Sequence, residues 1–143
     1  MPVSYKANWK NIGDKLQNLF RNEFGATVPV YIGEGDYADK QFIKIIPISN
    51  GLLEKQGTGE IKEYFFTFVV YISKTNSRKN NINKLYAIMS RSESLIANNR
   101  FMHLSDNSQM IDSGIMSSEI TELDEVYDYM VEMDYSCVHF DNM

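Results

Sequence analysis

The residues best suited to chemistry are one cysteine and two histidines, Cys137, His103 and His139, and their spacing favours no site. A zinc site normally takes four ligands at short paired spacings, which this set does not supply. A nucleophilic triad would need a reactive thiol. Cys137 instead lies on the apolar side of an alternating strand, where a buried, inert thiol is expected. We expect His139 to be half-buried on the same strand and His103 to lie in a loop.

Glycine-rich and acidic segments give no stronger signal. Residues 57–60 (Gly-Thr-Gly-Glu) lack the lysine and spacing of a phosphate-binding loop and predict a turn. The acidic turn at residues 34–39 lacks the ligand pattern of a calcium loop. The acid pairs at 124–125 and at Glu132 and Asp134 could do acid–base work only if buried, and the strand alternation puts Glu132 and Asp134 on the solvated face. The sequence therefore predicts no catalytic residue, no metal site and no cofactor, and we expect a protein that is not an enzyme.

Charge is distributed very unevenly along the chain. The first hundred residues carry all fourteen Lys and Arg against nine acids, and no Lys or Arg follows Arg100, whereas residues 101–143 carry ten acids. This polarity favours a chain that docks to copies of itself or to neighbouring proteins. The alternative is that the acids only keep a strand-rich segment soluble.

Length and composition predict one soluble domain over residues 1–143. A single cysteine excludes an intrachain disulfide and indicates a reducing compartment. The start of the chain has no signal-peptide pattern, and the longest apolar run, residues 65–72, is far shorter than the roughly 20 residues of a membrane helix. We expect no membrane association.

Two amphipathic helices are predicted from apolar residues spaced three or four apart. The first covers residues 5–24, with Ser4 as its cap, Gly25 as its end and Gly13 as a possible point of close contact. The second covers residues 82–97, capped by Asn80 or Asn81 and stopped by the asparagines at 98 and 99.

Five strands are predicted at residues 28–32, 42–48, 60–73, 109–120 and 126–140. Pro29 and Pro47 indicate edge positions, and Gly114 is expected to interrupt the fourth strand. The third strand is apolar on both faces, so it should be central and covered on both sides. The last strand alternates with one solvated face. The order predicts an α+β fold, a mostly antiparallel mixed sheet of about five strands with two helices packed on it.

Two loops are candidate contact sites for partners. The basic loop at residues 74–81 could attract phosphate or an acidic partner through Lys74, Arg78 and Lys79. The glycine-bounded loop at residues 50–59 carries the adjacent Leu52 and Leu53, which either reach a partner or fold back onto the core.

The element order and several segments resemble a known family. An amphipathic opening helix over residues 9–24 leads to the strand VPVYIGE, the aromatic strand EYFFTFVVYI leads into the helix NINKLYAIMSRSESLIA, and the chain closes on VYDYMVEMDYSCVHF. This layout resembles the tail terminator, or tail completion, proteins of long-tailed bacteriophages over nearly the whole chain.

The resemblance implies a virion structural protein that forms a ring, commonly a hexamer, without enzyme activity or cofactor. Such a ring caps the growing tail tube and offers a face for joining the head, and DNA later passes through it without sequence-specific contact. The implied partners are further copies of the chain, the tail tube protein and head-neck connector proteins. The implied location is the tail or neck of a virion assembled in the cytoplasm of a bacterial host.

A ring of this kind places two demands on its subunits. Each copy must offer two different patches that meet on neighbouring copies, and a channel for DNA should avoid strong attraction to phosphate. We therefore expect the acidic faces of the last two strands to lie toward the channel or toward a basic neighbour. The candidate residues are Glu122, Asp128, Glu132 and Asp134.

Two other functions fit the same sequence. The chain could be a head-completion protein or neck adaptor that binds on the portal side. It could also be a stand-alone α+β module that binds a peptide or small ligand, which predicts a monomer or dimer with a concave apolar pocket.

Overall fold

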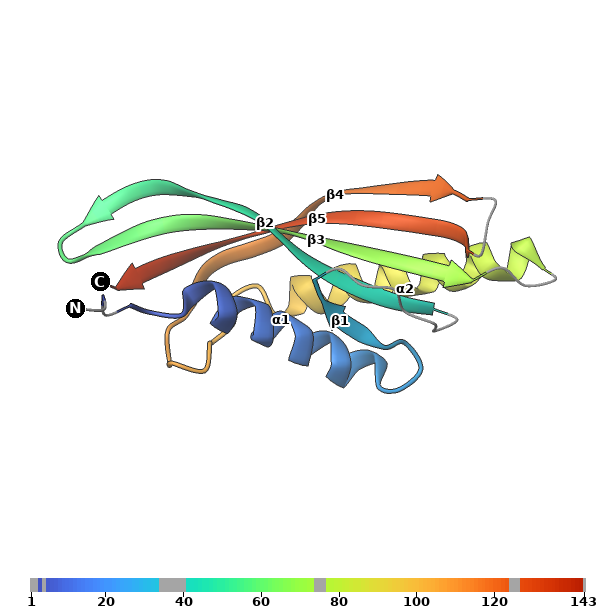
Figure 1. The fold of residues 1–143 in the computed structure, drawn as a ribbon, viewed down its shortest axis with the longest axis horizontal. Helices are drawn as coiled ribbons and strands as arrows, with labels where there is room; N and C mark the ends of the chain where they lie inside the picture. Colours follow the sequence, from blue (N-terminus) through green and yellow to red (C-terminus); the bar gives the residue numbers. More distant parts are fainter. Residues whose placement is uncertain (1–2, 4, 34–40, 74–76, 124–126, 143) are drawn as a thin grey trace.

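The computed structural model describes residues 3, 5–33, 41–73, 77–123 and 127–142, apart from the side chain of Asp128. Its elements are α1 (Asn8–Phe24), β1 (Val30–Ile32), β2 (Gln41–Gln56), β3 (Gly59–Ser73), α2 (Arg78–Asn98), β4 (Met110–Glu122) and β5 (Tyr127–Asn142). The five strands form one sheet in the order β1-β2-β3-β5-β4 (Figure 1). Only β1 and β2 pair in parallel, so the predicted α+β fold and mixed sheet are confirmed.

α1 forms because its apolar residues recur at helical spacing along one side. Ile12, Leu16 and Phe20 are fully buried in the core. Gly25 ends the helix with φ 62°, and its N–H donates to the Arg21 carbonyl oxygen at 2.8 Å. The start is later than predicted, because the helix begins at Asn8 after Ala7, and Ser4 lies outside the described residues.

α2 begins one turn earlier than predicted. Ser77 is its cap and accepts a hydrogen bond from the Asn80 N–H at 3.3 Å, so residues 78–81 are helical and not part of a loop. Asn81, an expected cap, is fully buried inside the first turn. The predicted end is confirmed, with Asn99 after the last helical residue.

β2 and β3 form a long hairpin through the segment that was predicted to be a loop. Their pairing continues to Gln56 opposite Gly59, which leaves a two-residue turn in which Gly57 has φ 55°. The turn at residues 57–60 is therefore confirmed and the loop over residues 50–56 was wrong. Pro47 lies beyond the stretch of β2 that β1 covers, so it sits at a free edge, as predicted.

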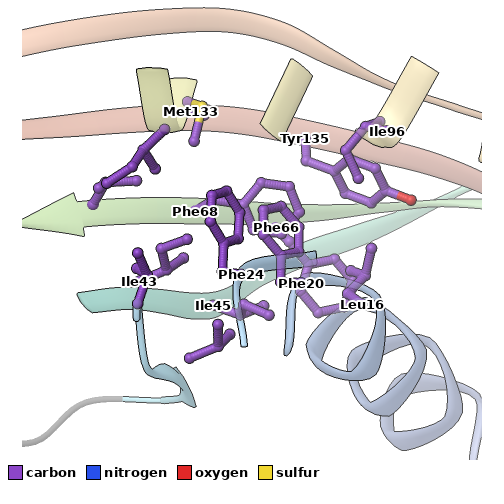
Figure 2. Close-up of a cluster of buried hydrophobic side chains, with 14 of the residues drawn as sticks. Leu16, Phe20, Phe24, Ile43, Ile45, Phe66, Phe68, Ile96, Met133 and Tyr135 are labelled. Carbon is purple, nitrogen blue, oxygen red and sulfur yellow. The ribbon is translucent and has the colours of Figure 1, made fainter. Parts of the chain in front are cut away.

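The core lies between the helices and one face of the sheet. β3 is the middle strand, as predicted, and α1 lies over β1 and β2 while α2 lies over β3, β5 and β4. Figure 2 shows rings and branched side chains from both helices meeting those of β3 and β5. The buried set includes Leu16, Phe20, Leu85, Ile96, Tyr64, Phe66, Phe68, Val131, Met133 and Tyr135.

The second face of the sheet was predicted to be covered and is not. Both helices lie on the same side (Figure 1), and among the described residues no helix or strand packs on the opposite side, called the open face below. The open face carries Phe65, Thr67, Val69 and Tyr71 of β3, with their register partners on β2 and β5. Its apolar residues are partly shielded by each other, since Val69 is only 5% exposed.

The two C-terminal strands follow the predicted alternation. In β5, Val131, Met133, Tyr135 and Cys137 are buried and Glu132 and Asp134 are exposed. Gly114 does not interrupt β4, because it pairs with Ser136 inside the strand. β4 is an edge strand of the sheet, as β1 is on the other side, and among the described strands it pairs only with β5.

Two glycines give a matched test of this packing. A Cβ on Gly13 would meet the Phe66 ring at 4.0 Å, an ordinary contact, so no exceptional closeness keeps glycine there. Gly13→Ala should stabilise the fold by about 0.5–1 kcal/mol through helix propensity. A Cβ on Gly59 would lie 2.3 Å from the Phe140 ring and 2.9 Å from the Asp141 carbonyl oxygen, so Gly59→Ala should destabilise. Urea unfolding measures both, and a destabilising Gly13→Ala would contradict the packing described.

Candidate subunit-contact surface

The open face has an aromatic end near β1. The Phe42 ring stacks on Tyr71 with centroids 4.9 Å apart and meets the edge of Tyr127 at 5.7 Å, while Tyr31 lies 6.0 Å away. The ammonium group of Lys44 lies 5.2 Å from the centre of the Tyr71 ring. These rings bury Phe42 without help from a helix, so this end of the face is closed by its own side chains.

The other part of the open face is acidic. Glu132 and Asp134 are exposed on β5, and Glu119 of β4 lies directly opposite Glu132 in the strand register. Asp134 accepts hydrogen bonds from the Thr67 and Ser117 hydroxyls at 3.2 and 3.1 Å. Like charges directly opposite each other destabilise a strand pair, so this acidic cluster (Glu119, Glu132 and Asp134) favours a basic partner.

Glu119 was absent from the predicted acidic set because only strand pairing brings it beside Glu132. The other predicted members are not placed with the cluster. Glu122 is opposite Tyr129, on the helical face, and its carboxylate pairs with the Arg78 guanidinium at 2.5 Å. The side chain of Asp128 lies outside the described residues.

The predicted basic docking loop is not a loop in its described part. Arg78 lies in the first turn of α2, where it also donates to the Leu123 carbonyl oxygen at 3.0 Å and lies over the Tyr129 ring. Lys79 is exposed on the same turn, and Lys74 lies outside the described residues. The structure therefore ties Arg78 to the end of β4 and leaves Lys79 exposed beside it.

Part of the charge polarity is used within the chain. Among the described residues, ion pairs that join the basic first hundred residues to the acidic remainder include Arg78–Glu122 and Arg100–Asp112 at 2.5 Å each and Lys62–Asp141 at 3.8 Å. The hydrogen bond from Arg100 is the main cause that lowers the pKa of Asp112. Docking through net polarity alone is therefore weaker than the sequence implied, because some opposite charges already meet.

Leu52 and Leu53 lie on β2 near the end of the hairpin, which extends beyond both helices (Figure 1). Their exposed fractions are 49% and 55%, so neither folds back onto the core. Of the two interpretations left open by the sequence, folding back onto the core is wrong, and contact with a partner stays a prediction.

A buried polar network joins the end of β5 to the segment before β4. His139 Nδ1 lies 2.6 Å from Asp141 Oδ1, and the Tyr64 hydroxyl donates to Asp141 Oδ2 at 2.5 Å. His139 Nε2 lies 2.8 Å from the Ser108 Oγ. His139 is fully buried, which corrects the half-buried placement predicted from the sequence, whereas His103 is exposed outside the strands as expected. The alternation of β5 puts His139 and Asp141 on the core side, so the sequence pattern could have predicted that His139 is fully buried.

The Ser108, His139 and Asp141 spacing resembles a hydrolase triad, but the Ser108 hydroxyl has a second acceptor in Asp106. The Ser108 hydroxyl also lies 2.5 Å from Asp106 Oδ1, and this hydrogen bond lowers the pKa of Asp106 and keeps it an ionised acceptor. A serine hydroxyl has one proton, so donation to Asp106 leaves Ser108 Oγ as the acceptor for His139. A triad base must instead accept the serine proton, so this arrangement fixes the chain and does not activate Ser108.

Burial suppresses the other reactive groups. It raises the pKa of Cys137 to about 12, so the thiol is neutral and inert, as predicted. It also raises the pKa of Tyr64, with a further contribution from the hydrogen bond to Asp141. Across the described residues, no group of three or more His, Cys, Asp or Glu side chains could hold a metal ion. None of the described helices is long and apolar enough to cross a membrane.

The fold has a counterpart among solved structures. A chain from the structure titled "Virion of native gene transfer agent (GTA) particle" matches with a TM-score of 0.52 and 7% sequence identity. The match covers 85% of this chain and 84% of that chain, so the two folds agree over most of their lengths. No protein-family model and no curated protein matches the sequence.

Tyr64→Phe tests the buried network. Removing the hydroxyl that donates to Asp141 should lower the free energy of unfolding by about 1–3 kcal/mol, measured by urea unfolding at pH 7. Because burial raises the pKa of Tyr64, this contribution is complete below about pH 10, the ordinary tyrosine value, and is lost as pH rises further. The exposed Tyr86 gives the control, and Tyr86→Phe should change stability by less than about 0.5 kcal/mol. Equal losses in both variants would contradict the role of the hydroxyl.

Proposed function

We propose that this chain is a structural subunit of a phage-like virion that forms a ring, with six-fold symmetry, on the tail tube and joins the tail to the head. The observation that carries the proposal is the match to a chain of a gene transfer agent virion over 85% of this chain and 84% of the other. The resemblance of the element order to tail terminator proteins gives the finer role within that class.

The uncovered parts of the sheet support assembly with other copies. In the part of the chain that the structure describes, one face carries only its own side chains, and β4 leaves one long edge of the sheet without a partner. A subunit that stood alone would gain by covering these surfaces, whereas a ring subunit needs them for its neighbours.

The chemistry of the described residues supports a role without catalysis. The Ser108 proton is directed to Asp106, and Cys137 is a buried neutral thiol. A function that makes or breaks covalent bonds would need a nucleophile with a free base, which these groups do not provide.

The acidic cluster suggests how each subunit is oriented in the proposed ring. In the proposed ring, Glu119, Glu132 and Asp134 face the channel or the basic surface of a neighbour. A negative channel wall would repel phosphates and let DNA slide. Glu122 is left out of this role because Arg78 already neutralises it on the helical face.

Electron microscopy of concentrated, negatively stained protein tests the ring directly. Annular particles are expected, and a protein that stays monomeric both in solution and in the presence of tail tubes would overturn the proposal. Binding to uncapped tail tubes, against binding to filled heads, separates the tail terminator role from the neck adaptor role.

Charge reversal tests the acidic cluster. Glu132→Lys combined with Asp134→Lys should reduce ring formation or the passage of DNA at least tenfold, because two of the three clustered carboxylates become cations. The control is Glu93→Lys on the exposed side of α2, which should leave both unchanged. Rings and infectivity at wild-type levels in the double variant would contradict the assigned orientation.

A further inference from the structure

β4 and the part of β2 beyond β1 form free edges of the sheet, and each carries two register shifts. β2 has register shifts between Pro47 and Ser49 and between Leu52 and Glu54, which leave Ile48 and Leu53 as the extra residues. β4 has shifts between Met110 and Asp112 and between Ile115 and Ser117, which leave Ile111 and Met116. Each of these four bulge positions is therefore occupied by a large apolar residue.

All four side chains are exposed to solvent. The exposed fractions are 58% for Ile48, 55% for Leu53, 46% for Ile111 and 56% for Met116. A bulge leaves its extra residue outside the regular pairing and re-aims the side chain. Four apolar residues at four such positions, all solvent-exposed, are costly for an isolated subunit and useful for one that docks.

The spacing on the two edges is the same. Ile48 and Leu53 are five positions apart on β2, and Ile111 and Met116 are five positions apart on β4, about 17 Å in an extended strand. The edge of β2 beyond β1 and the edge of β4 lie on opposite sides of the sheet. Two pairs of exposed apolar side chains with equal spacing can therefore contact each other at the same time when two copies meet edge to edge.

We infer that a second copy of this chain docks through these edges, with Ile48 and Leu53 on β2 of one copy against Ile111 and Met116 on β4 of the next. This inference rests on the proposed ring and specifies its subunit contact. β2 and β4 run in opposite directions within the sheet, so copies that point the same way bring these edges together antiparallel. That alignment places Ile48 opposite Met116 and Leu53 opposite Ile111.

Charge disfavours contact between two identical β4 edges. The charged residues of β4 are Asp112, Glu119 and Glu122, so two β4 edges would repel each other. The part of β2 beyond β1 carries Glu54 and Lys55, whose charges cancel, so it meets the acidic strand without that penalty. Contact between unlike patches repeats from copy to copy and closes a ring when the rotation permits.

Two complementary variants test the contact. Ile48→Asp with Leu53→Asp disables only the β2 edge, and Ile111→Asp with Met116→Asp disables only the β4 edge. Each should weaken self-association at least tenfold in analytical ultracentrifugation, yet an equimolar mixture should form heterodimers through the one pair of intact edges. Tyr86→Asp, an exposed residue on α2, is the control and should associate like the wild type.

Cross-linking tests the register independently of affinity. Ile48→Cys combined with Met116→Cys should form intermolecular disulfides when concentrated protein is oxidised, since the native Cys137 is buried. Absence of this cross-link, or a variant that dimerises with its β2 or β4 edge disabled and without mixing, would overturn the inference.

The outcomes separate the contact from the ring. Annular particles that persist in both edge variants would refute the edge contact and leave the proposed function standing. Disulfide-linked copies that build open chains instead of rings would support the contact and refute the ring.

Discussion

Burial of one face of the sheet beneath both helices is the constraint on which the rest of the structure depends. Each helix has one apolar stripe, and both stripes are used on the same side, where they meet the rings of β3 and β5. The second face must therefore be stabilised by its own side chains. It achieves this with the stacked rings around Phe42 at one end and with hydroxyl–carboxylate hydrogen bonds around Asp134 at the other. In the described part of the chain, the edge of β2 beyond β1 and the edge of β4 remain unpaired.

The buried polar network has a similar local cause. α1 begins at Asn8, and the hairpin and the end of β5 extend past it (Figure 1). There the apolar side chains give way to Tyr64, His139 and Asp141, which satisfy one another and hold Ser108 against the sheet. At that end of the core, hydrogen bonds between buried polar side chains replace hydrophobic packing. This structural role explains why a serine, a histidine and an aspartate lie together there without forming a catalytic triad.

Sequence reasoning succeeded where periodicity alone decides the structure. The stripe of α1, the alternation of β5 and the central place of β3 all follow from spacing that tertiary contacts reinforce. It failed where pairing partners decide. Residues 50–56 look like a loop because of their polar and glycine content, but β3 pairs with them along the whole hairpin. Other features depend on the register in which strands pair, and that register cannot be read from a single sequence. They are the position of Glu119 beside Glu132, the bulges on β2 and β4, and the Arg78–Glu122 ion pair.

The bulges on β2 and β4 also affect the chain before it meets any partner. A long, regular exposed strand is a template for cross-β growth, which is nucleated by runs of about six or seven ladder-forming residues. Each bulge interrupts the regular pairing of its strand and so limits the length of ladder that an exposed edge can offer. The positions that the proposed edge contact would use therefore also shorten the template for fibril growth.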